Sequence, residues 1–169
     1  MIALTPMLLT AIGLLIVRFR KLAWRDDVGF KAPGLRPFLF WCAIFLIIAT
    51  IGESVTDSGA GQSWRGKYSA ADLAVRVAAV ALLYPIAEEF FFRGVFLGVV
   101  RRRFGDVAAV ALPALIFGLI HIQYDWQGMA FVALDGLIFG IARIRTGSVC
   151  VPMLLHIMGN GYAVWERLA

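Results

Sequence analysis

The sequence predicts an all-α protein, a polytopic bundle of about six transmembrane helices. Of its 169 residues, 61% are hydrophobic and only 16% are charged. The mean hydropathy of +0.83 is far above that of soluble domains with polar surfaces. Several apolar runs approach the roughly 20 residues that a helix needs to cross a bilayer. Lipid is therefore the expected solvent for most of the chain.

Apolar runs between charged residues predict the helices in order. They are expected at Ile2–Val17, Phe38–Gly52, Ala70–Val100, Val107–Ile122, Met129–Ala142 and Val149–Trp165. The third run is too long for one straight span, and Pro85 within it lacks a backbone donor and crowds the preceding turn. We expect a kink or a break there. The Gly- and Ser-rich stretch from Asp57 to Gly66 is expected to be an outer loop with high flexibility.

Basic residues predict the orientation in the membrane. The loops at Arg18–Arg36, Arg101–Arg103 and Arg143–Arg145 hold six, three and two basic residues, whereas the other side holds three. By the positive-inside rule, these loops are cytoplasmic and the N-terminus is outside. The net charge of +5 then follows from topology, so no nucleic-acid partner is expected. Anionic lipid headgroups are the expected partners of the arginine triplet.

Ionisable side chains are costly at membrane depth, so those found there are usually paired or functional. The apolar runs contain Glu88, Glu89, Arg93, His121, Asp135 and His156. Glu89 precedes Arg93 by four residues, the favourable order for an ion pair on a helix, whereas the same offset from Glu88 reaches a phenylalanine. We expect Glu89 to be structural and Glu88 to be free for a reaction. The alternative is that both are solvated residues at a helix end.

The two histidines each have a partner one helical turn away. Phe117 lies one turn before His121, and Asn160 lies one turn after His156 on the same helix face. Alone, His121 is also explained as an interfacial hydrogen-bonding residue, and the pair His156 and Asn160 as a polar clasp between helices.

The polar residues of these three segments are expected at similar depths in the membrane. At about 1.5 Å per residue from the basic loops, Glu88, His121, His156 and Asn160 lie about 20, 22, 13 and 20 Å inside the bundle. Their common layer predicts a shared site. Arg93 and Asp135 are each about 12 Å from the same face, so we expect them to form a second buried pair, with Asp135 structural.

Three motifs in this order resemble the CAAX-protease and bacteriocin-processing family, the intramembrane endopeptidases related to the type II CAAX prenyl endopeptidase. They are Glu88–Glu89–x–x–x–Arg93, Phe117–x–x–x–His121 and His156–x–x–x–Asn160. The resemblance covers about residues 81–160. It implies a division into residues 1–69, with two transmembrane helices and an outer loop, and residues 70–169, the protease core.

By this resemblance, Glu88 would be the general base that activates water, and His121 would hold and polarise that water. His156 and Asn160 would stabilise the oxyanion. Glu88, His121 and His156 would also be the ligands of a catalytic zinc, which family members have often been assigned. No His-Glu-x-x-His helix is present and an asparagine is a poor zinc ligand, so the sequence favours a metal-free glutamate mechanism without a cofactor.

The expected function is that of an intramembrane endopeptidase, a hydrolase acting on a membrane-associated, lipidated or C-terminally anchored protein. The alternative is a non-catalytic membrane protein, such as an immunity factor or a scaffold. The expected location is a bacterial inner membrane, crossed several times, with the lipid bilayer and a protein or peptide substrate as partners.

Overall fold

The computed structural model describes residues 4–55 and 63–169, and every regular secondary-structure element among them is a helix. The α-helices are α1 (Leu4–Arg20), α2 (Leu35–Val55), α3 (Ala70–Ala78), α4 (Tyr84–Glu89), α5 (Leu97–Leu119), α6 (Trp126–Thr146) and α7 (Cys150–Leu168). The π-helical segments are η1 (Trp24–Val28), η2 (Ala79–Leu83) and η3 (Phe90–Phe96). The predicted all-α membrane bundle is confirmed. Most of the predicted outer loop, residues 57–62, lies outside the described residues.

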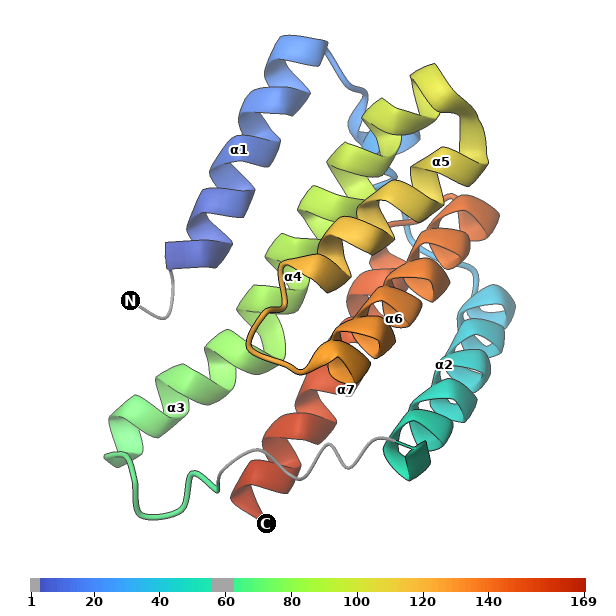
Figure 1. The fold of residues 1–169 in the computed structure, drawn as a ribbon. Coiled ribbons are helices and arrows are strands. Elements are labelled where there is room, and N and C mark those ends of the chain that lie inside the picture. The colour runs from blue at the N-terminus through green and yellow to red at the C-terminus, as the bar shows by residue number, and fades with distance from the viewer. Residues whose placement is uncertain (1–3, 56–62) are drawn as a thin grey trace.

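Residues 70–119 form one uninterrupted series of helical elements that reverses direction at Gly105. Gly105 has φ 77° and ψ −177°, a backbone conformation that residues with a Cβ rarely adopt. The reversal divides this series into two helices, as the sequence predicted (Figure 1).

Three stretches among the described residues are long and apolar enough to cross a membrane: 35–52, 70–119 and 126–146. In the first of these, only 6% of the residues are buried within the protein, although its mean hydropathy is 2.0. Such an exposed apolar helix requires lipid around it. The chain is therefore a membrane protein.

Pro85 does not break its helix. Instead, the helix widens just before the proline, in η2, where the Tyr84 N–H donates to the carbonyl of Ala79, five residues back. A proline removes one backbone donor and crowds the carbonyl four residues earlier, and the wider π-helical turn accommodates both effects. The irregularity expected at Pro85 thus lies at residues 79–83.

The basic loops gather at one end of the bundle. Asp27 connects them: its carboxylate accepts hydrogen bonds from Arg102, and its backbone carbonyl accepts one from Arg143 at 2.9 Å. Partial burial opposes ionisation of Asp27, but the Ala23 N–H and the guanidinium groups of Arg102 and Arg143 outweigh it and lower its pKa below the ordinary value of 3.8. We call this group the Asp27 cluster.

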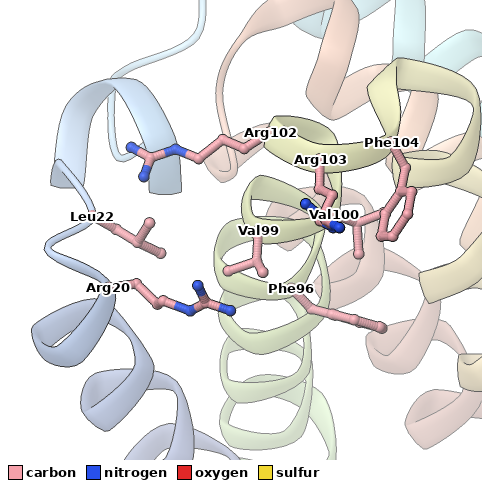
Figure 2. A pocket seen from close by; sticks show the side chains of 8 residues that line it. All are labelled: Arg20, Leu22, Phe96, Val99, Val100, Arg102, Arg103 and Phe104. Carbon is pink, nitrogen blue, oxygen red and sulfur yellow. The ribbon is translucent and has the colours of Figure 1, made fainter.

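A cavity of about 550 Å³ opens at the same end, between the end of α1 and the first half of α5 (Figure 2). Its walls combine arginines with apolar side chains. The lining residues are Arg20, Leu22, Phe96, Val99, Val100, Arg102, Arg103 and Phe104.

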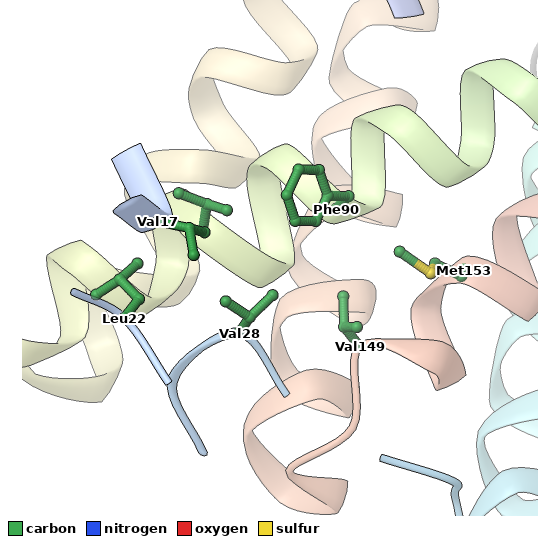
Figure 3. Packing of buried hydrophobic residues seen from close by; sticks show 7 residues of the cluster. Val17, Leu22, Val28, Phe90, Val149 and Met153 are labelled. Carbon is green, nitrogen blue, oxygen red and sulfur yellow. The ribbon is translucent and has the colours of Figure 1, made fainter. Parts of the chain in front are cut away.

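One apolar cluster fixes the turn that follows the two glutamates (Figure 3). Phe90 comes directly after Glu89, and its ring stacks on Trp24 at 5.9 Å. A Cβ at Gly13 would lie 2.6 Å from the Phe90 ring, so only glycine lets α1 approach this closely. The buried members of the cluster are Val17, Leu22, Val28, Phe90, Val95, Val149 and Met153. The N-terminal helix thereby supports the helix that carries the glutamates.

Small residues let α5 and α6 pack closely. A Cβ at Gly118 would lie 2.7 Å from the Cβ of Ala133 and 2.8 Å from the carbonyl oxygen of Met129. In membranes, where lipid is as apolar as the helices, such close backbone contact is a main source of helix association. This contact fixes the end of α5, where His121 follows.

Candidate active site

Glu88 and Glu89 end α4 and are buried, with exposed fractions of 8% and 0%. Adjacent residues on a helix project about 100° apart, so the two carboxylates have different neighbours. Glu89 accepts a hydrogen bond from Arg93 Nη1 at 2.8 Å, four residues later. The predicted Glu89–Arg93 ion pair is therefore present.

Aromatic rings surround the guanidinium of Arg93. Its Cζ lies 4.5 Å from the ring centre of Phe117, 5.4 Å from that of Phe139 and 5.8 Å from that of Phe92. These rings exclude water and attract the cation through their faces. A Cβ at Gly136 would lie 3.0 Å from Arg93 Nη2, so α6 leaves just enough room for the guanidinium.

His156 of α7 contacts both glutamates. Its Nδ1 lies 3.0 Å from Glu89 Oε1, and its Nε2 lies 3.8 Å from Glu88 Oε2. An ionised carboxylate only accepts hydrogen bonds, so Nδ1 donates to Glu89 and the ring orientation is fixed. The sequence did not predict the contact with Glu89, because nothing in the local pattern connects residues 67 positions apart.

His121 follows the end of α5. Its Nδ1 lies 2.6 Å from the carbonyl oxygen of Phe117, which can only accept, so Nδ1 carries the proton and Nε2 is free to accept. The Phe117 ring contacts both imidazoles, with ring centres 4.6 Å from His121 and 5.9 Å from His156. Tyr124, which the sequence analysis did not select, stacks on His121 at 6.1 Å with an angle of 2° between the rings.

Asn160 contacts the glutamate helix two turns before Glu88. Its Nδ2 donates to the carbonyl oxygen of Val80 at 2.9 Å. This carbonyl has lost its usual helical donors, because the Tyr84 N–H goes to Ala79 and Pro85 has no N–H. Asn160 satisfies it with one N–H and keeps a second N–H. The alternative interpretation of Asn160, as a polar contact between helices, thus accounts for its hydrogen bond to Val80.

The expected pair between Arg93 and Asp135 is present only as an electrostatic interaction, without direct contact. Within the described part of the chain, no ion pair within 4.0 Å joins them, and Asp135 is only partly buried. Counting residues along a helix gives a depth in the membrane but not the direction of a side chain around the helix axis. Gly136, one residue later, is the α6 position that contacts Arg93.

The candidate zinc ligands do not form a metal site. Among residues 4–55 and 63–169, no three His, Cys, Asp or Glu side chains are placed to hold a metal ion together. Glu88 and His156 approach each other, whereas no hydrogen bond or ion pair in this part of the chain joins His121 to Glu88. Two of the three candidate ligands, Glu88 and His156, are therefore close together in this structure.

The buried Glu-Glu-Arg group, His156 on α7 and His121 just after α5 all lie in a segment that matches a known family. Residues 70–162, more than half of the chain, match the family described as Type II CAAX prenyl endopeptidase Rce1-like. The chain belongs to this family. This membership supports a membrane endopeptidase in general.

A curated relative is an uncharacterized 24.3 kDa protein of Escherichia coli, 35% identical over 89 residues. The aligned part is 51% of this chain and 41% of that protein, so the chain spans less than half the length of this relative. No solved structure matches the chain.

Proposed function

We propose that this protein is an intramembrane endopeptidase of the glutamate type, with Glu88 as general base. The observation that carries the proposal is the contact of His156 with both buried glutamates, beside the Glu89–Arg93 ion pair. If the Glu89–Arg93 ion pair had only a structural role, a second carboxylate beside it would not be needed. Burying an additional charge without a close partner costs free energy. Glu88 is that second carboxylate.

In the proposed reaction, Glu88 takes a proton from a water molecule, and the resulting hydroxide attacks the scissile carbonyl. The oxyanion then receives hydrogen bonds, and the proton on Glu88 passes to the leaving amine as the C–N bond breaks. We assign His121 to hold the water, because its Nε2 can accept a hydrogen bond while Nδ1 is engaged with Phe117.

His156 and Asn160 are the proposed oxyanion donors. Since His156 Nδ1 donates to Glu89, donation from Nε2 requires the doubly protonated imidazolium. In that state the charges of Glu88, Glu89, Arg93 and His156 add to zero, which lowers the cost of burying all four. Asn160 would use the N–H that Val80 does not take.

The proposed substrates are membrane-associated, lipidated or C-terminally anchored proteins. Their termini can be compared by mass spectrometry in membranes from cells that express the protein or its Glu88→Gln variant. Glutamine keeps the shape of the side chain but cannot take a proton, so the new termini should disappear. Glu166→Gln on α7 is the matched control, because Glu166 lies outside the site, and it should leave the termini unchanged.

A strong zinc chelator, applied to the same membranes, separates the glutamate mechanism from a metal-dependent one. Cleavage should persist in the chelator. Loss of cleavage, with recovery on adding zinc, would replace the metal-free mechanism with a metal-dependent one while leaving the peptidase function in place.

A further inference from the structure

The cavity between α1 and α5 has a charged half and an apolar half. Arg20, Arg102 and Arg103 contribute guanidinium groups, and the five other lining residues are apolar, with no carboxylate among them. Its volume of about 550 Å³ is within the range of small-molecule sites. An occupant should therefore combine negative charge with an apolar part.

Two of the three arginines have uncompensated charges. Arg102 forms an ion pair with Asp27, whereas neither Arg20 nor Arg103 has a carboxylate within 4.0 Å among the described residues. In Figure 2, Arg20 extends from the end of α1 toward α5, while Arg102 extends in the opposite direction. The two unpaired charges lie on different parts of the cavity wall: Arg20 reaches across from α1, and Arg103 lies on α5 beside Val100 and Phe104.

The position of the cavity indicates a lipid. It lies at the basic end of the bundle, beside the reversal at Gly105, which is the level of the headgroups if the apolar stretches span the bilayer. Phe96 and Val99, which are partly buried, and Phe104, which is 62% exposed, offer an apolar surface beside the charges. A soluble anion would leave this surface unused, and a zwitterionic headgroup would bring an ammonium group to the arginines.

We propose that this cavity binds one anionic phospholipid. Its phosphate lies between Arg20 and Arg103, and an acyl chain follows Val99 and Phe96 toward the membrane interior. The site is separate from the glutamates and does not depend on the proposed peptidase activity. Binding would hold the end of α1 against α5 and so stabilise the N-terminal helix.

The test uses the full chain in a non-ionic detergent and measures the unfolding temperature during titration with phosphatidylglycerol, phosphatidylcholine or inorganic phosphate. Phosphatidylglycerol should raise the unfolding temperature saturably, and the other two should not. An arginine near an anionic surface strengthens binding about fivefold, so Arg20→Gln with Arg103→Gln should weaken it by about twenty-fivefold. The control pair, Arg18→Gln with Arg25→Gln, removes the same charge from exposed residues outside the cavity and should bind normally.

A second variant tests the apolar half without changing charge. Val99→Phe narrows the cavity at a partly buried position and should also abolish the effect of phosphatidylglycerol. Normal lipid binding by both Val99→Phe and the Arg20, Arg103 variant would overturn the proposal. Equal effects of phosphatidylcholine, or of inorganic phosphate, would do so as well.

Discussion

Two groups of opposite charges hold this bundle together, in different surroundings. Glu89 and Arg93 have side chains that are 0% and 1% exposed and lie among aromatic rings. Asp27 and Arg102, at the basic end, are 20% and 52% exposed. The cost of removing a charge from water is therefore large in the first group and small in the second. The comparison teaches that breaking similar ion pairs in one protein can cost very different amounts of unfolding free energy.

The largest expected effect is that of breaking the buried pair. Arg93→Met keeps much of the side-chain volume but leaves Glu89 without its cation, which should cost about 3–5 kcal/mol of unfolding free energy. Arg102→Met, the matched change at the exposed pair, should cost at most about 1 kcal/mol. Unfolding in mixed micelles by a denaturing detergent measures both. Equal losses would contradict the contrast between the two groups.

The next largest effect concerns the hydrogen bond between the Asn160 side chain and the Val80 carbonyl. Both groups are neutral, so this contact can be compared with the two charged pairs. Asn160→Ala leaves the Val80 carbonyl without a donor, at a cost of about 1–3 kcal/mol. Pro85→Ala restores a backbone N–H five residues after Val80. In that background, Asn160→Ala should therefore cost about 1 kcal/mol less. Additive losses in the double-mutant cycle would show that the proline does not create the need for the asparagine.

The smallest effect is the pH dependence of the Asp27 cluster. Because the pKa of Asp27 is lowered on folding, its contribution is complete above the ordinary value of 3.8 and is lost as the pH falls through the folded value. Asp27→Asn lacks this contribution, which should be under about 1 kcal/mol. The difference in unfolding temperature between wild type and variant should shrink below about pH 4. A difference that stays constant from pH 7 to pH 3 would exclude this role.

Much of the fold could be predicted from local sequence patterns. Long apolar runs define the helices, and the spacing of four residues predicts the Glu89–Arg93 pair. The sequence could not predict contacts that depend on how helices rotate and pack. The His156–Glu89 and Asn160–Val80 hydrogen bonds join residues 67 and 80 positions apart. The missing direct contact between Arg93 and Asp135, which interact only at longer range, has the same origin, since depth alone does not determine which helix faces meet.

The central claim is that Glu88 acts as the base while Glu89 and Arg93 hold the histidine beside it. Its most direct test is the rate of substrate cleavage by purified protein in vesicles, for wild type, Glu88→Gln and Glu166→Gln. Glu88→Gln should lower the rate by at least about a thousandfold with an unchanged unfolding temperature, and Glu166→Gln should cleave at the wild-type rate. A well-folded Glu88→Gln protein that keeps more than about a tenth of the rate would contradict the claim.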